Sequence, residues 1–152
     1  MAILAFELRY YLSNWIFMRT NPMRSPESLL QEQVCQWLRL QHPGVLFHSD
    51  YGSGLKMTKI NAILQKKMQK TRAWPDMFIA EPRGPFCGLF LELKHLTSSE
   101  VLRDGTMGNS EHVREQRVVL EMLQEKGYQA TFAIGFDQAQ ELINSYLTTS
   151  AR

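Results

Sequence analysis

Cysteine is scarce in this sequence. Cys35 and Cys87 are its only cysteines among 152 residues, and they form no C-x-x-C pair. A zinc site built from thiolates and a disulfide framework are therefore not expected. Two reduced thiols are typical of a protein kept in a reducing compartment. We therefore expect a cytoplasmic protein.

The chain also lacks long apolar runs and any large excess of one charge. No apolar run reaches the roughly 18–20 residues that span a bilayer, so no membrane segment is expected. Lys and Arg number 17 against 15 Asp and Glu, and the net charge of +2 gives no strong attraction to nucleic acid or membrane. With 44% hydrophobic and 21% charged residues, the composition is that of one soluble globular domain.

The first 24 residues form a separate, aromatic-rich segment. Charged residues interrupt its apolar stretch and no small-residue cleavage site follows, unlike a secretory signal. We interpret residues 1–24 as an N-terminal extension, a helix or strand that packs on the domain or on a second subunit. The alternative is that translation starts at Met18 or Met23. The domain itself is expected over 25–147, with a loose tail at 148–152.

Helix and strand signals alternate along this domain. Ser25 and Pro26 mark a helix start, Gly127 ends a later helix, and Asp137 can cap the last one. The predicted elements are a helix over 26–40, strands over 45–48, 76–80 and 88–94, a helix over 111–126, a strand over 128–134 and a helix over 137–147. This order predicts an α/β three-layer sandwich with a mixed sheet, in which antiparallel pairs come first and a crossover last.

Four polar residues stand where periodicity predicts burial. Glu92 and Lys94 share one face of a strand that is apolar on both faces and therefore central. Glu27 lies on the apolar stripe of the first helix, and Gln116 lies within the stripe of the second. Each has a structural explanation: a buried ion pair, an acid suited to the helix dipole, and an amide bonded to backbone.

A different explanation joins these residues to Asp76. Asp76 begins one strand and Glu92 lies near the end of its hairpin partner, so their carboxylates can converge. Two carboxylates and a backbone carbonyl suit Mg²⁺, which prefers oxygen ligands and can activate water and neutralise phosphate charge. Lys94 can hold the attacking water and stabilise the transition state. The combination predicts phosphodiester hydrolysis.

Pro75-Asp76 followed by Glu92-Leu93-Lys94 resembles the signature of the PD-(D/E)xK nuclease superfamily. More narrowly, it resembles the VRR-NUC family of virus-type replication and repair nucleases, over about residues 25–146. The resemblance implies a restriction-endonuclease-like fold. It also implies that Glu27 assists at a metal site from further out, and that Gln116 bonds to metal-bound water or to a phosphate oxygen. Further supporting features are Gln31 and the region of Gly52 and Gly54.

The resemblance implies roles for the signature residues as well. Asp76 and Glu92 would ligate Mg²⁺, for which Mn²⁺ can substitute, with the Leu93 carbonyl as a further ligand. Lys94 would position the nucleophilic water and stabilise the pentacovalent phosphate. No organic cofactor is expected.

A basic stretch leads directly into the signature. Residues 55–74 contain six basic residues and no acidic one, which is typical either of a solvated lysine-rich segment or of a phosphate-contacting surface. Because the stretch precedes Asp76 so closely, we favour DNA contact. Trp74 is either a hydrophobic anchor or a base-stacking platform, and we favour the anchor. The basic residues are Lys56, Lys59, Lys66, Lys67, Lys70 and Arg72.

The resulting hypothesis is a Mg²⁺-dependent DNA endonuclease from a phage or bacterium. Small members of the family resemble Holliday-junction resolvases, which implies a homodimer acting on branched or duplex DNA in replication, repair or recombination. Two alternatives stay open. The first is a catalytically inert nucleic-acid-binding module or subunit. The second is a non-enzymatic α/β protein in which Glu92 and Lys94 form a structural ion pair.

Overall fold

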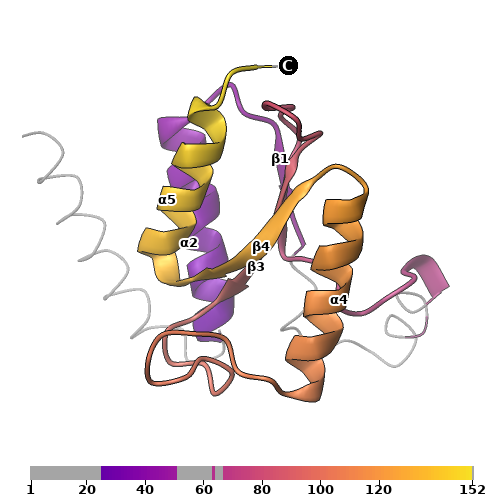
Figure 1. The fold of residues 1–152 in the computed structure, drawn as a ribbon. Helices are drawn as coiled ribbons and strands as arrows, with labels where there is room; N and C mark the ends of the chain where they lie inside the picture. Colours follow the sequence, from indigo (N-terminus) through magenta and orange to yellow (C-terminus); the bar gives the residue numbers. More distant parts are fainter. Residues whose placement is uncertain (1–24, 51–62, 64–66, 152) are drawn as a thin grey trace, which may run out of the picture.

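The computed structural model describes residues 25–50, 63 and 67–151. The predicted N-terminal extension therefore lies outside the described residues. The described part contains the predicted order of helix, strand, strand, strand, helix, strand and helix (Figure 1). The elements are α2 (Pro26–Gln41), β1 (Phe47–Ser49), β2 (Met77–Ile79), β3 (Leu89–Lys94), α4 (Glu111–Glu125), β4 (Gln129–Ile134) and α5 (Gly135–Thr148).

The four strands form one mixed sheet in the order β1-β2-β3-β4. The β1–β2 and β2–β3 pairs are antiparallel, and β4 returns parallel to β3 after the α4 crossover. All six residues of β3 are buried, because this strand has a neighbour on each side and helices on both faces. The predicted topology and the central position of this strand are both confirmed.

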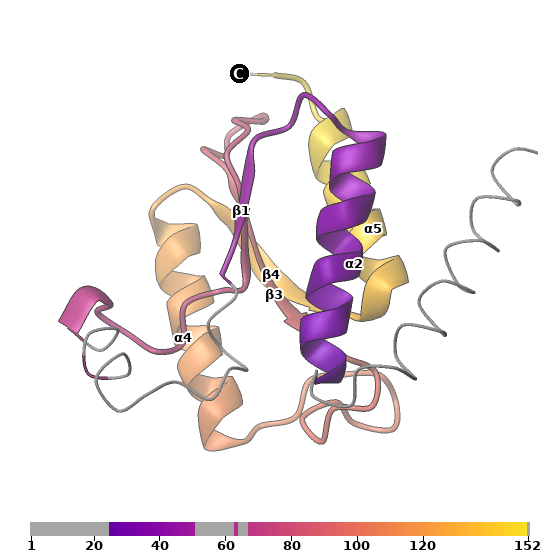
Figure 2. The same cartoon turned by 180° about the vertical axis from the view of Figure 1, so that it is seen from behind.

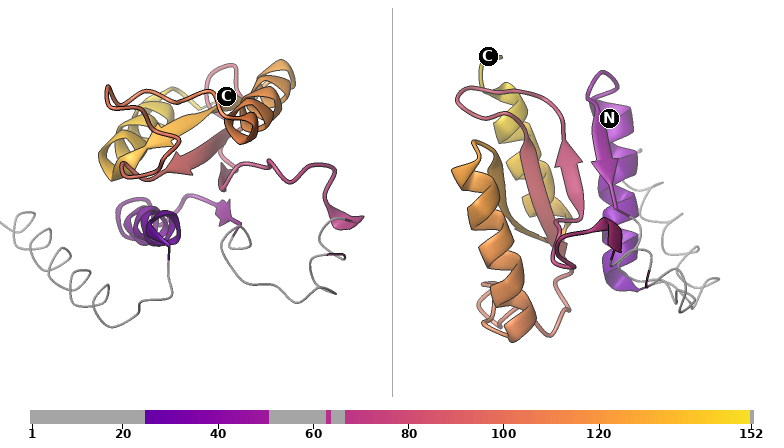
Figure 3. Two further views of the ribbon diagram at one scale, coloured as in Figure 1. Left: turned by 90° about the horizontal axis from the view of Figure 1, so that it is seen from below. Right: turned by 90° about the vertical axis from the view of Figure 1, so that its right-hand side faces the viewer.

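Helices cover the two faces of the sheet unequally. Figure 1 shows α2 and α5 side by side on one face and α4 on the other, and Figure 2 shows the same layers from behind. Alternation along β3 explains this division. Leu91 packs with Leu38 and Ile143 in the core beneath α2 and α5, whereas Phe90 packs with Leu120 in the core beneath α4. The right-hand view of Figure 3 shows the sheet between α4 and α2. The molecule is thus the predicted three-layer sandwich.

Local signals determine where most helices begin and end. The Ser25 side chain accepts a hydrogen bond from the Ser28 N–H (3.1 Å), and Pro26 occupies the first turn, as predicted. Gly127 follows the end of α4 with a φ of +86°, a left-handed conformation that favours glycine. Among the described residues, no helix is long and apolar enough to cross a membrane.

The predicted start of the last helix is wrong. Asp137 does not cap α5, because β4 passes directly into the helix at Gly135, which has a φ of +77°. The capping residue is Ile134, and its N–H donates to Gln138 Oε1 (2.5 Å). Asp137 instead lies in the first turn, where a carboxylate suits the positive end of the helix dipole.

Candidate active site

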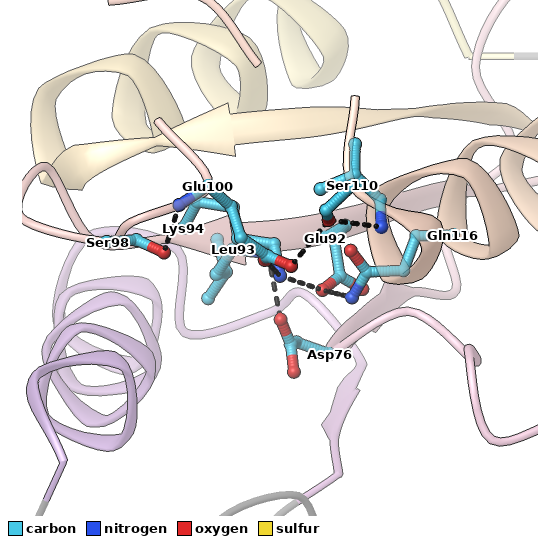
Figure 4. A network of polar contacts seen from close by, with 9 residues as sticks. Asp76, Glu92, Leu93, Lys94, Ser98, Glu100, Ser110 and Gln116 are labelled. Atoms are coloured by element: carbon cyan, nitrogen blue, oxygen red, sulfur yellow. Dashed lines mark hydrogen bonds and ion pairs between the residues drawn. The ribbon is translucent and has the colours of Figure 1, made fainter. Parts of the chain in front are cut away.

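Four of the predicted site residues lie together at one end of the sheet. Asp76 immediately precedes β2, Glu92 and Lys94 belong to the end of β3, and Gln116 projects from α4 (Figure 4). Antiparallel pairing of β2 and β3 places the start of one strand beside the end of the other. The backbone N–H of Leu93 donates to Asp76 Oδ2 (2.9 Å), which ties the carboxylate to β3.

Asp76 is a partly exposed residue whose carboxylate is poorly solvated. Burial raises its pKa to about 6, although the hydrogen bond from Leu93 and the charge of Lys94 act in the opposite direction. The negative charges of Glu27 and Asp50 raise it further. A carboxyl group with this pKa is mostly ionised at neutral pH, and its poorly solvated charge favours a bound cation.

Glu92 and Lys94 form a buried ion pair. Each residue is only 4% exposed, and Lys94 Nζ lies 3.3 Å from Glu92 Oε1. Burial and the neighbouring charge of Asp76 nevertheless raise the pKa of Glu92 to about 8, against the attraction of Lys94. Two carboxyl groups therefore lie close together in a region that water solvates poorly. Such a pair is costly unless positive charge beyond that of one lysine offsets it.

Glu100 is a site residue that sequence reasoning missed. It reaches in from the loop between β3 and α4, and its Oε2 lies 2.8 Å from Lys94 Nζ (Figure 4). Ser110 Oγ donates to the other oxygen of Glu100 (3.3 Å). Burial lowers the pKa of Lys94, but the hydrogen bond to Glu100 and the charge of Glu92 outweigh it and raise the pKa above its ordinary value. The lysine is thus a fully charged donor held between two carboxylates.

Gln116 supplies an unsatisfied oxygen to the site. Its Nε2 donates to Glu92 Oε1 (2.5 Å), so its amide carbonyl is oriented by that bond. Gln116 Oε1 is buried and has no hydrogen-bond partner among the described residues. An orphaned buried carbonyl costs roughly 1–3 kcal/mol, which a cation or a cation-bound water would relieve.

The donor set fits a hard divalent cation. Asp76 and Glu92 offer carboxylate oxygens, and Gln116 offers a free carbonyl oxygen. Because the N–H and C=O of one strand residue point to the same neighbour, the Leu93 carbonyl faces the side on which its N–H meets Asp76. No group of three or more His, Cys, Asp or Glu side chains arranged to hold a metal occurs in the described part of the chain.

Glu27 does not follow the predicted inward direction. It is exposed in the first turn of α2, and it reaches the site only through its charge, which raises the pKa of Asp76. The buried polar residue of this helix end is Gln31, one turn later. Its Nε2 donates to Ser49 Oγ (2.8 Å) and to the backbone oxygens of Asp50 (2.6 Å) and Asp76 (3.2 Å). The amide thereby fastens α2 to the ends of β1 and β2.

The predicted DNA-binding residues are placed only in part. Lys56, Lys59 and Lys66 lie outside the described residues, whereas Lys67 and Lys70 are exposed. Arg72 forms two hydrogen bonds of 3.2 Å with the Glu115 carboxylate of α4, so its guanidinium fastens the segment before β2 to that helix. Contact of these side chains with DNA stays a prediction.

Comparison with known proteins supports the fold. No family model and no curated protein matches the chain. A solved structure described as a "VRR_NUC domain protein" is similar, with a TM-score of 0.62 and 24% sequence identity over 84% of this chain and 93% of that chain. A likeness at this identity establishes architecture. The chain therefore has the restriction-endonuclease-like fold of a VRR_NUC domain protein, as the Pro-Asp and Glu-x-Lys signature predicted.

Proposed function

We propose that this protein is a metal-dependent endonuclease that hydrolyses phosphodiester bonds in DNA. The nuclease-like fold supports the reaction class. The observation that carries the proposal is the pair of poorly solvated carboxylates, Asp76 and Glu92, beside the unsatisfied carbonyl of Gln116. A divalent cation stabilises the buried negative charge of such a site more than any side chain around it does.

The residues divide the chemistry as follows. Asp76 and Glu92 would hold the cation, with Mg²⁺ as the expected ion and Mn²⁺ as a substitute. When bound, such a cation lowers the pKa of a water ligand and neutralises charge that grows on the phosphate. Lys94 orients the attacking water and donates to the phosphate oxygens, since Glu92 and Glu100 keep its ammonium charged and fixed. The free carbonyl oxygen of Gln116 would accept a hydrogen bond from water at the cation site.

The finer assignment concerns the DNA itself. We propose structure-specific cleavage in replication, repair or recombination, with two copies of the chain acting on branched DNA. The exposed Lys67 and Lys70 precede Asp76 closely in sequence, which supports contact with a polyanion next to the site. Light scattering of the full chain with and without a four-way junction tests the dimer. A mass of one chain without DNA, and of one chain per junction with DNA, would remove that part of the proposal.

One observation favours a non-enzymatic alternative. The Glu92–Lys94 ion pair exists in the structure and could serve stability alone. Two measurements separate the readings: cleavage of labelled junction, flap and duplex DNA with and without Mn²⁺ or Mg²⁺, and the shift in melting temperature that each ion causes. The nuclease shows both cleavage and stabilisation by the ion. A purely structural ion pair shows neither, and an inert binding module shows Ca²⁺-supported DNA binding without cutting.

A further inference from the structure

A cleft of about 340 Å³ lies next to the candidate active site and shares Asp76 with it. Its volume stands at the low end of the roughly 300–1,000 Å³ typical of small-molecule sites, so it suits one small planar group. The chemistry of its wall is mixed: one exposed aromatic ring, one lysine, one histidine and two carboxylates. The lining residues that matter to the argument are His48, Asp50, Lys70, Trp74, Asp76 and Phe78.

Trp74 is the notable member of this wall. It is 48% exposed, although Ala73 before it is 2% exposed and Pro75 after it is buried. The rings of Trp74 and Phe90 are nearly perpendicular, with centroids 5.6 Å apart and planes at 87°. The ring of Phe90 in turn stacks on that of Phe78, with centroids 4.4 Å apart. The indole is thus anchored by Phe90, as the sequence predicted, while about half of the residue remains open to solvent.

The segment that carries Trp74 is fixed to the domain. Arg72 bonds to Glu115 of α4 through two contacts of 3.2 Å, and within the segment the Ala73 N–H donates to Thr71 Oγ1 (3.1 Å). Ala73 belongs to the core beneath α4. A large ring held this way loses little conformational freedom on binding, so it forms a ready platform for another flat group.

We propose that this cleft binds one unpaired nucleobase, stacked on Trp74, from the strand whose phosphate lies at Asp76. The inference rests on the proposed nuclease function and names the substrate class of that site. Stacking requires a free π face, which bases inside a duplex do not offer because their neighbours cover both faces. The cleft therefore selects DNA with an unpaired nucleotide beside the cleaved bond, such as a flap or a frayed branch. Lys70, in the same wall, supplies positive charge for the adjoining phosphate.

Binding tests the inference without cleavage. Flap DNA that carries 2-aminopurine at its first unpaired position is titrated with the full chain in Ca²⁺, and stacking quenches the 2-aminopurine fluorescence. Trp74→Ala should remove the quenching and weaken flap binding by about 5- to 100-fold, the range expected for one base–aromatic stack, while duplex binding changes by less than about 2-fold. Met122→Ala is the matched control, because Met122 is a 44%-exposed apolar residue of α4 outside the cleft.

Trp74→Phe guards against misfolding, since phenylalanine keeps a ring near Phe90 while offering a smaller face. It should retain the wild-type melting temperature and show an intermediate loss of flap binding. Equal losses on flap and duplex DNA, or unchanged quenching in both Trp74 variants, would overturn the inference. If both Trp74 variants cleave flap DNA at the wild-type rate, base binding in the cleft is refuted and the proposed nuclease function stands. If quenching depends on Trp74 but the protein cuts no DNA, the nuclease function is refuted and base binding in the cleft stands.

Discussion

Cation binding between Asp76 and Glu92 should displace about one proton at pH 7. The pKa of Asp76 is raised to about 6 and that of Glu92 to about 8. At pH 7 the two carboxyl groups together therefore hold about one proton. A cation requires both groups ionised, so its binding releases that proton. Between pH 6 and pH 8 the apparent affinity for the cation should rise about tenfold per pH unit.

Isothermal titration calorimetry measures this release directly. Mn²⁺ is titrated into the full chain in two buffers with different heats of ionisation, and the difference in apparent enthalpy gives the number of protons released. Glu92→Gln should reduce that number to nearly zero, because the remaining carboxyl, Asp76, is mostly ionised at pH 7. Glu125→Gln is the control, since it makes the same charge change at an exposed position at the far end of α4.

The refuting result is equally specific. Cation binding that releases no proton and keeps one affinity from pH 6 to pH 8 would mean that the two carboxyl groups are already ionised in the folded protein. A Glu92→Gln variant that releases as many protons as the wild type would place the titrating group elsewhere. Either outcome would mean that the cation does not bind at carboxyl groups with raised pKa values.

Three further predictions concern stability and the side chains around the site. Without a divalent cation, the folded protein keeps protons on Asp76 and Glu92 that the unfolded chain loses between about pH 4 and pH 8, because the pKa values of these two groups are raised. Its melting temperature should therefore fall as the pH rises through that window, and differential scanning calorimetry at pH 5 and pH 8 would contradict this by showing the reverse order. Gln31→Leu should lower the free energy of unfolding by roughly 1–3 kcal/mol in urea titrations, because it removes the buried amide that donates to Ser49 Oγ and to the backbone oxygens of Asp50 and Asp76. An unchanged urea midpoint would count against that role. Glu100→Gln removes the carboxylate that lies 2.8 Å from Lys94 and helps raise its pKa, so the alkaline limit of DNA cleavage should move to lower pH. An identical pH profile would show that Glu100 does not act through the lysine.

Much of the fold follows from local patterns. The alternating leucines of β3 and the apolar stripes of the helices carry strong periodic signals, and the short hairpin after β2 leaves antiparallel pairing as the simplest arrangement. That pairing alone brings Asp76 to the end of β3, so the convergence of Asp76 with Glu92 was predictable. The start of α5 was not, because the transition depends on the backbone conformation of Gly135 rather than on a capping side chain.

The sequence did not reveal the partners of residues that act through tertiary contacts. Glu100 lies in a polar loop without periodicity, and only the fold shows which of the loop's acids reaches Lys94. The sequence nonetheless contained one signal. A buried charged lysine needs more hydrogen-bond partners than one carboxylate supplies, so a second acid from the following loop could be expected. Gln31 and its partner Asp76 are 45 residues apart in the chain, and Arg72 and its partner Glu115 are 43 residues apart. Side-chain spacing within one element cannot indicate such partners.

Cleavage of labelled flap DNA by Asp76→Asn in Mn²⁺ tests the central claim most directly. Asparagine keeps the size of the side chain and removes the charge that would bind the cation, and Glu125→Gln again serves as the matched control. We expect the Asp76 variant to fold with a melting temperature close to or above that of the wild type, because an uncharged group suits its poorly solvated position. Its cleavage rate should fall by about a thousandfold or more, in the range seen when a charge-stabilising group is removed from an active site. Cleavage at the wild-type rate by folded Asp76→Asn would contradict the assignment of this site to phosphodiester hydrolysis.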